Sequence, residues 1–456
     1  MKWAIWIVVG GFWACQSRPS EPARARQAPV APSVVLPTAA QTRPAIHPYW
    51  NDLARLLAGL TPQDTLFWRE AIRDSAWKRY AKGLAWLWEA RKKALYDSLA
   101  VWAARELEPY HTWKGTVFYP FSGADWPTVV YVYPQGQRYI FFGLEQEGDP
   151  HYLRLLPPGE IVRHLQGTYA TLQDLLRLSF FKTKDMQEQL AQGKVRGLLP
   201  VFLALFARTG HLIYSVEHIY LRPDGTIDTL SGYQRKPPQS AWDNPITGLR
   251  FQVGRPEGPV QEVLYLSLNA ANTGLERQQG SRAFLSRLRP CVTLIKSASY
   301  LLFGPDFSEM RRLILSQSVA ILEEDSGIPY RFFDSTAWRL QLYGVYHAPI
   351  PLFRNKFQAD LWQAYRTQPV KRLPFTIGYH TVPGQSNLIW AVRRNPEAAL
   401  PPLPADTFVA QPKVSPLPSK PAFSDSLQFA LPETAATGSD TTSALPAIEA
   451  PSGGSE

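Results

Sequence analysis

The chain has 456 residues, enough to bury a stable core without covalent cross-links. It contains 2 Cys, and no apolar run after the first residues approaches the roughly 20 that a transmembrane helix needs, so we expect neither a disulfide framework nor a membrane-spanning body. The formal net charge is +10 at pH 7. The basic residues form only short clusters without a nucleic-acid-binding motif, so we expect no nucleic-acid partner.

The N-terminus reads MKWAIWIVVGGFWAC. One lysine, Lys2, precedes about a dozen apolar residues, too few to cross a bilayer but typical of a secretory signal. A small alanine before Cys15 fits lipoprotein cleavage, whereas Phe12 and Trp13 fit the usual lipobox poorly. We expect residues 1–14 to be a signal peptide and Cys15 to accept lipid. The alternative is an ordinary signal peptide in which the cysteine is incidental.

Two segments flank the expected body, and neither of them shows apolar periodicity. Residues 15–46 are rich in Pro, Ala and Arg, which predicts an extended tether. Residues 395–456 are rich in Pro, Ser, Thr and Ala and cannot bury enough apolar surface to offset the entropy of ordering, which predicts a disordered tail.

Residues 47–209 form a helix-rich N-terminal part. The pattern T-P-Q-D at 61–64 combines a cap with an early proline and predicts the start of a long helix, or a pair of helices, that ends near Leu107. A strand begins at Val117, and Asp125 is expected to cap a short helix after it. The sequence then predicts a strand at 138–144 and helices at 159–181, 185–192 and 198–207.

Residues 210–394 form a mixed α/β C-terminal part. It opens with a hairpin whose turn is Arg222-Pro223-Asp224-Gly225. A capping box at 306–309 predicts a helix that runs to about Leu322. Further strands are expected at 249–253, 260–268, 299–303, 328–333, 338–346, 373–379 and 387–392, with helices at 281–288 and 357–365. The fold class is therefore α+β (mixed), with an N-terminal helical segment, strand–helix–strand units and antiparallel hairpins.

Two stretches resemble each other: FYPFSGADW followed by GQRYIFFG, and SYLLFGPDF followed by GIPYRFFD. Each reads as an aromatic strand, a Gly-x-Asp-aromatic turn, a helix and a second aromatic strand. The likeness raises the hypothesis of an internal duplication, which would place Asp125 and Asp306 at equivalent corners.

Three consecutive acids, Glu323, Glu324 and Asp325, lie where the expected helix ends. The helix dipole disfavours negative charge at that end, so this cluster is the local feature that most needs an explanation. One interpretation is a carboxylate cluster that serves acid–base chemistry or binds a cation, with Asp306, Glu324 and Asp325 as candidate catalytic residues. The other is a solvated helix-to-strand turn. Asp306, like Asp125, is explained equally well as a helix cap.

The sequence contains no recognisable motif for metal binding, nucleotide binding or nucleophilic catalysis. The eight histidines show no compact metal-ligand spacing, and no nucleotide-binding loop or Gly-x-Ser-x-Gly elbow is present, so we expect no metal and no cofactor. His347 and His380 each follow a tyrosine at an expected strand end, so they either converge or are hydrogen-bonded histidines at the sheet edge, and we favour the second. Cys291 is expected to be a buried, inert thiol. The chain has 15 Trp, 20 Tyr and 22 Phe, which favours core packing for most of them and sugar contact for some.

The segments FYPFSGADW, YIFFGLE, KSASYLLFGPDF, ILEEDSGIPYRFF, YGVY and LPFTIGY resemble an uncharacterised family of exported bacterial proteins, many with lipoprotein-type leaders. The resemblance covers most of the body and neither flanking segment. It implies export, but no activity, ligand or catalytic residue.

These observations predict a cell-envelope protein anchored by lipid at the periplasmic face of a membrane or in the outer membrane. Binding or scaffolding, with an envelope glycan or protein as partner, is the leading hypothesis, and it predicts an aromatic-lined groove without clustered titratable groups. The alternative is a carboxylate-dependent hydrolase of envelope polymers. A structural spacer without a pocket is the third.

Overall fold

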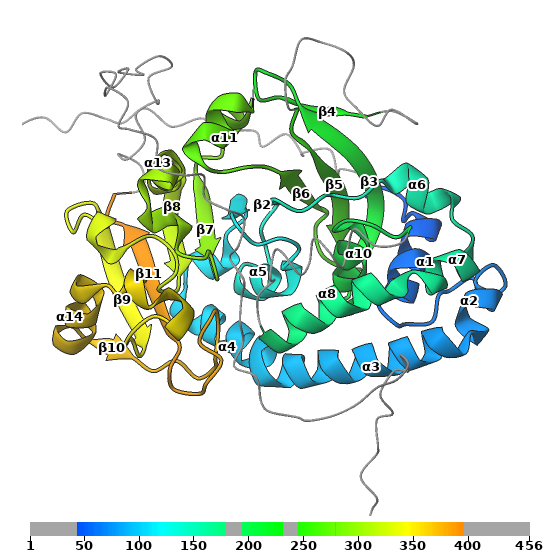
Figure 1. Ribbon diagram of the computed structural model, residues 1–456, viewed down its shortest axis with the longest axis horizontal. Coiled ribbons are helices and arrows are strands. Elements are labelled where there is room, and N and C mark those ends of the chain that lie inside the picture. Colours follow the sequence, from blue (N-terminus) through cyan, green and yellow to red (C-terminus); the bar gives the residue numbers. More distant parts are fainter. Residues whose placement is uncertain (1–42, 179–193, 231–244, 279, 396–456) are drawn as a thin grey trace, which may run out of the picture. The chain divides into compact units, whose positions relative to one another are not determined.

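The computed structural model describes residues 43–178, 194–230, 245–278 and 280–395 (Figure 1). The expected signal peptide, Cys15 and most of the tether lie outside these residues, as do the expected helix at 185–192 and the C-terminal tail after residue 395. The described residues combine α-helices with one 11-stranded mixed sheet, which confirms the α+β class.

The strands run in the order β10-β9-β11-β8-β7-β1-β2-β6-β5-β3-β4. Strands from both the N-terminal and the C-terminal part of the body therefore share one sheet. The strands are β1 (Thr116–Tyr119), β2 (Arg138–Gly143), β3 (Leu212–Leu221), β4 (Ile227–Thr229), β5 (Thr247–Gly254), β6 (Gln261–Ser267), β7 (Cys291–Ile295), β8 (Ser318–Glu323), β9 (Trp338–Gly344), β10 (Val370–Lys371) and β11 (Asn387–Arg393).

The five central strands, β8-β7-β1-β2-β6, are all parallel, and antiparallel strands flank them on both sides. The chain builds outward from β1 to β2 and β6, then returns to place β7 on the other side of β1. The strand order therefore reverses between β1 and β7. In open α/β sheets such a switch point opens a crevice beyond the carboxyl ends of the strands.

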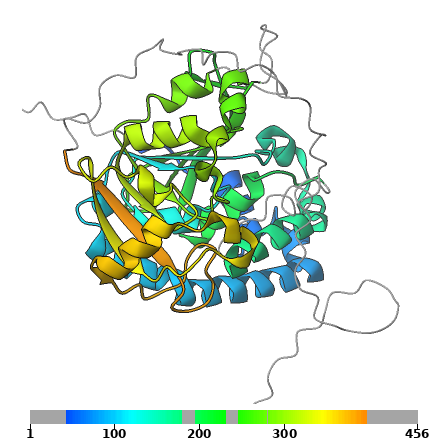
Figure 2. The ribbon, with the colours of Figure 1, turned by 60° about the vertical axis from the view of Figure 1, so that its left-hand side comes forward.

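Burial explains why the central strands form. Every residue of β7 and β8 is buried, as expected for parallel strands covered on both faces. Figures 1 and 2 show helices on both sides of these strands, with α3 and α8 on one side and α11 and α13 on the other.

The helices that follow the chain are α1 (Pro48–Leu57), α2 (Arg69–Arg73), α3 (Ser75–Arg91), α4 (Asp97–Glu106), α5 (Trp126–Val132), α6 (Pro150–Leu155), α7 (Pro158–Arg163), α8 (Leu165–Leu178), α10 (Leu199–Arg208), α11 (Asn272–Arg277), α12 (Ser281–Leu285), α13 (Ser308–Gln317) and α14 (Ala359–Thr367). Short 3-10 or π segments are η1 (Lys92–Tyr96), η2 (Tyr110–Thr112), η3 (Leu301–Phe303), η4 (Pro305–Phe307), η5 (Tyr330–Phe332) and η6 (Pro351–Lys356). α10 is apolar all round, and its residues from Leu199 to Phe206 are buried in the core beneath the sheet.

The predicted helix at 306–322 is wrong in its second half. α13 ends at Gln317, and Ser318 starts β8, which pairs with β7 and β11. A short apolar run fits a helix or a buried strand equally well, and only the pairing partners decide. The expected capping box is also absent, because Glu309 N–H donates to Asn272 rather than to Asp306 (3.1 Å).

Three expected strands are also wrong: residues 299–303, 328–333 and 373–379 lie outside the strands that the structure describes. The first contains η3 and the second η5. These aromatic-rich segments form 3-10 turns, bends and irregular backbone instead of joining the sheet. The duplication hypothesis ends here, since YIFFG is strand β2 whereas YRFF is a 3-10 turn.

Candidate functional site

A pocket with a volume of about 110 Å³ lies at the switch point of the sheet. The segments that follow β1, β2, β6 and β7 form it, and each leaves the carboxyl end of its strand. The pocket combines an apolar wall with a polar floor. A few polar groups set among apolar walls are typical of small-molecule sites.

Three phenylalanines form the apolar wall. The ring of Phe121 lies edge-on to Phe142 at 5.2 Å and to Phe307 at 6.1 Å between centroids. They come from the loop after β1, from β2 and from η4. Edge-to-face packing holds aromatic rings in fixed positions, so this wall is built before any ligand arrives.

A buried ion pair forms part of the floor. Lys296, the first residue after β7, places Nζ 2.5 Å from Oδ2 of Asp125, and both side chains are 3% exposed. The carboxylate of Asp125 also accepts hydrogen bonds from Tyr119 Oη (2.7 Å) and Thr128 Oγ1 (2.9 Å). Burial lowers the pKa of Lys296, although the Asp125 carboxylate opposes the shift.

The expected role of Asp125 as a helix cap is wrong. Asp125 does occupy the N-cap position of α5, but its side chain accepts no backbone N–H there. The carboxylate instead accepts hydrogen bonds from Lys296, Tyr119 and Thr128. Glu145, two residues after β2, and Asn269, two residues after β6, add further polar groups to the pocket.

The loops around the pocket are conformationally strained. Among the described residues, the non-glycine residues with positive φ are Phe121 (59°), Ser297 (53°), Ser299 (53°) and Tyr300 (53°). All four lie in the loops that follow β1 and β7, and the first three line the pocket. The left-handed conformation costs such residues about 1–3 kcal/mol each, and it persists where the surrounding structure enforces it.

The predicted acidic cluster lies at the end of strand β8, not at a helix end. Glu324 and Asp325 are each 1% exposed. Asp306 lies in η4 and is exposed, and no hydrogen bond or ion pair joins it to either acid within the described ranges. The structure therefore keeps Asp306 apart from the other two candidates, and none of these three residues lines the pocket.

Asp325 is fully hydrogen-bonded. Its carboxylate accepts hydrogen bonds from Tyr300 Oη (2.6 Å), Asn387 Nδ2 (2.8 Å) and His380 Nε2 (3.0 Å). Burial alone would raise the pKa of Asp325, but the bonds from His380, Tyr300 and Asn387 outweigh it and hold the pKa below its usual value. Because Tyr300 is one of the strained residues, this network fixes the loop after β7.

The pKa values of Glu323 and Glu324 are shifted in the opposite direction to that of Asp325. Burial, followed by the charge of neighbouring acids, raises the pKa of Glu324 well above its usual value, and burial does the same for Glu323. Glu324 accepts from Ser297 N–H (2.8 Å), so the end of β8 braces the loop that carries Lys296. Glu324 and Asp325 therefore hold the loop after β7 in place, although they do not line the pocket themselves.

The remaining candidates are structural. His347 is exposed and His380 is buried against Asp325, so they do not form a pair. Cys291 is buried in β7, and burial raises the pKa of its thiol to about 11, which agrees with an inert thiol.

Sequence reasoning missed Lys296, Glu145 and the phenylalanine wall. The sequence contained a signal, because Lys296 follows directly after the apolar run CVTLI, and Glu145 lies two residues after the run YIFFG. Recognising them required knowing that these runs are adjacent parallel strands.

In the described ranges no group of three or more His, Cys, Asp or Glu side chains could hold a metal ion. Within the same ranges, no helix has both the length and the apolar character that crossing a membrane requires. Comparisons of the chain with protein-family models, curated proteins and solved structures found no match.

Proposed function

We propose that this chain is a binding protein of the cell envelope, and that the pocket at the switch point holds one sugar ring at the end of an envelope glycan. A sugar ring has apolar C–H faces and a polar hydroxyl rim. The wall of Phe121, Phe142 and Phe307 suits the first, and Glu145 and Lys296 suit the second, with Asp125 holding Lys296 in place.

The size of the pocket supports a small occupant. A dry cavity of about 150 Å³ accepts benzene. At about 110 Å³, this pocket is smaller than that cavity and has room for part of one sugar ring, with the rest of the ring and of a longer molecule outside. The occupant is therefore an end group rather than an internal segment of a polymer.

The concentration of strain in the pocket loops carries the proposal. Phe121, Ser297 and Ser299 all have positive φ and all line the pocket, and strained backbone in folded proteins clusters at functional sites. Pre-ordered loops reduce the entropy that a ligand must overcome on binding. Strain of this kind supports recognition of a specific ligand over a purely structural spacer.

The pocket differs from the groove expected from sequence, since Asp125, Glu145 and Lys296 are titratable and lie together. These groups do not favour the hydrolase. That alternative relied on Asp306, Glu324 and Asp325, and Asp306 lies apart from two acids that are buried behind the pocket. Asp125 is occupied by three hydrogen-bond donors and is poorly placed to exchange protons with a substrate.

The envelope location rests on the leader, whose short apolar run ends at Cys15. A diacylglyceryl group and an amide-linked chain would give more than one acyl chain, which is enough for stable anchoring. The pocket would then face envelope glycans at high local concentration.

The test is calorimetric titration with a panel of monosaccharides and disaccharides that includes N-acetylglucosamine and N-acetylmuramic acid. We expect one of them to bind at 1:1, and Phe307→Ala or Glu145→Gln to weaken it at least tenfold, which is about 1.4 kcal/mol. Phe357→Ala removes an equally large, 48% exposed ring outside the pocket and should leave the affinity unchanged. Equal loss in all three variants, or no binding by any sugar, would contradict the proposal.

A further inference from the structure

The outward face of α3 carries a row of basic side chains around one exposed tryptophan. Lys78, Arg79, Lys82, Trp86 and Lys93 recur at spacings that place them on one side of the helix and its continuation in η1. We call these five residues the α3 face. Trp86 is 66% exposed, and the four basic residues share the face with one exposed acid, Glu89.

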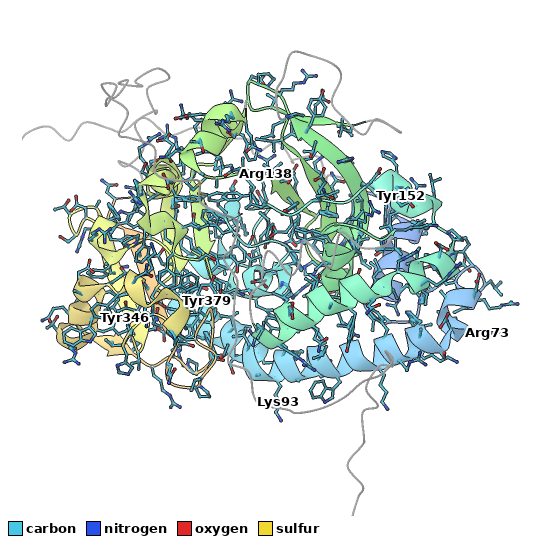
Figure 3. All side chains as sticks on the ribbon, in the orientation of Figure 1. Arg73, Lys93, Arg138, Tyr152, Tyr346 and Tyr379 are labelled. Carbon is cyan, nitrogen blue, oxygen red and sulfur yellow. The ribbon has the colours of Figure 1, made fainter. Side chains whose placement is uncertain are left out.

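The opposite side of α3 is buried against the core of the protein. Trp77, Tyr80, Leu84, Leu87 and Trp88 pack into the core, partly against α8. Figure 1 shows α3 as the outermost layer at one end of the view, with α8 between it and the sheet. Figure 3 shows Arg73 and Lys93 at the two ends of this layer, both directed away from the body. No described element covers the α3 face.

The four basic side chains are not neutralised locally. In the described part of the chain, the ion pairs formed near this helix use Lys92 and Asp97, not Lys78, Arg79, Lys82 or Lys93. The face therefore presents net positive charge to the solvent. Just beyond it, Val101 on α4 adds an apolar side chain that is 68% exposed.

We propose that the α3 face binds the surface of an anionic phospholipid bilayer. Lysine and arginine bury their alkyl stems along apolar material while their charges stay among the headgroups. Tryptophan prefers the same depth, because its ring is apolar and its N–H is polar. Because the apolar side of α3 is already packed in the core, the contact relies on the four basic side chains and the indole of Trp86 rather than on an inserted apolar face.

The face suits a bilayer better than a protein or nucleic-acid partner. None of its five residues lines either of the two pockets described in the structure, and the indole of Trp86 is its one aromatic ring. This surface is separate from the pocket, and it binds whether or not Cys15 carries lipid. On an anchored protein it would hold α3 against the membrane.

The test measures partitioning onto vesicles with the full-length chain carrying Cys15→Ser, so that no acyl chain contributes. Vesicles of 30% phosphatidylglycerol in phosphatidylcholine are compared with pure phosphatidylcholine at low and high salt. Each basic residue near the surface contributes about fivefold, so Lys78→Gln/Lys82→Gln/Lys93→Gln should lose roughly 100-fold in partitioning onto the anionic vesicles. High salt should remove most of the preference.

The matched control is Arg277→Gln/Arg287→Gln/Arg339→Gln, which removes the same charge from exposed positions outside the α3 face and should lose far less. Trp86→Ala should weaken binding several-fold, whereas Phe357→Ala should not. Circular-dichroism melting establishes that every variant is folded. Equal losses in the two triple variants, equal binding to neutral vesicles, or unchanged binding by the lysine variant would overturn the proposal.

Discussion

Lys296 and Asp125 join the loops after β7 and β1 through an ion pair whose Nζ–Oδ2 distance is 2.5 Å and whose side chains are both 3% exposed. The two residues are 171 positions apart in the chain. They meet where the strand order of the sheet reverses, and they connect the buried network around β8 with the floor of the pocket.

We expect Lys296→Met to destabilise the protein by about 3–5 kcal/mol, because it leaves the carboxylate of Asp125 buried without its counter-charge. The double variant Lys296→Met/Asp125→Asn should recover part of that loss, since no buried charge remains. Urea unfolding of the wild type, both single variants and the double variant measures the coupling. Additive losses would show that the pair does not act as a unit.

Glu323 makes stability fall as pH rises. Its raised folded-state pKa means that the folded protein keeps a proton that the unfolded chain releases above about pH 4.5. The stability contributed by this proton is complete below that pH and is lost toward the higher folded-state pKa, at up to about 1.4 kcal/mol per pH unit. Glu323→Gln titrates in neither state, so its free energy of unfolding should decline less between pH 5 and pH 8.

The control for this pH experiment is Glu276→Gln, an exposed glutamate on α11 that should keep the wild-type pH dependence. Glu324 contributes a slope of the same sign, so Glu323→Gln reduces the decline without abolishing it. Identical slopes for wild type and Glu323→Gln would show that Glu323 is ionised in the folded protein.

Ser297 offers a direct measure of the strain in the pocket. Its φ is 53°, and its hydroxyl has no hydrogen-bond partner within the described structure. Ser297→Gly relieves the left-handed strain, whereas Ser297→Ala keeps it, so the glycine variant should be more stable than the alanine variant by about 1 kcal/mol. The same glycine variant should bind ligand more weakly, because its loop is less ordered. Thermal unfolding and titration of both variants provide the two comparisons.

The leader makes a separate prediction about mass. We expect the mature protein to begin at Cys15 and to carry a diacylglyceryl group and an amide-linked acyl chain, and Cys15→Ser to incorporate no labelled palmitate. Intact mass spectrometry of the membrane fraction measures both. A mature chain that retains Met1 or bears an unmodified Cys15 would contradict the proposed anchor.

Much of the sheet was predictable because its strands carry strong local patterns. Strands β2, β3, β5, β6, β9 and β11 fall within or close to predicted strands, as the alternation or density of β-branched and aromatic residues indicates. β8 was not predicted, because its run from Ser318 to Leu322 continues the apolar spacing of α13. Its identity as a strand comes from its neighbours β7 and β11, which the local sequence does not contain.

The pocket could not be predicted for a related reason. Asp125 and Lys296 are each unremarkable in sequence, one as a helix cap and the other as the end of an apolar run. Only the parallel order β7-β1-β2-β6 brings them together with Glu145 and Asn269. The predicted trio failed to assemble because Asp306 belongs to an exposed turn, whereas Glu324 and Asp325 belong to a buried strand end.

A crystal structure with the tightest-binding sugar decides whether the pocket at the switch point holds a sugar ring. We expect the ring to pack against Phe121, Phe142 and Phe307, with its hydroxyls within hydrogen-bond distance of Glu145 or Lys296. A sugar bound elsewhere on the protein, with this pocket left to solvent, would contradict it.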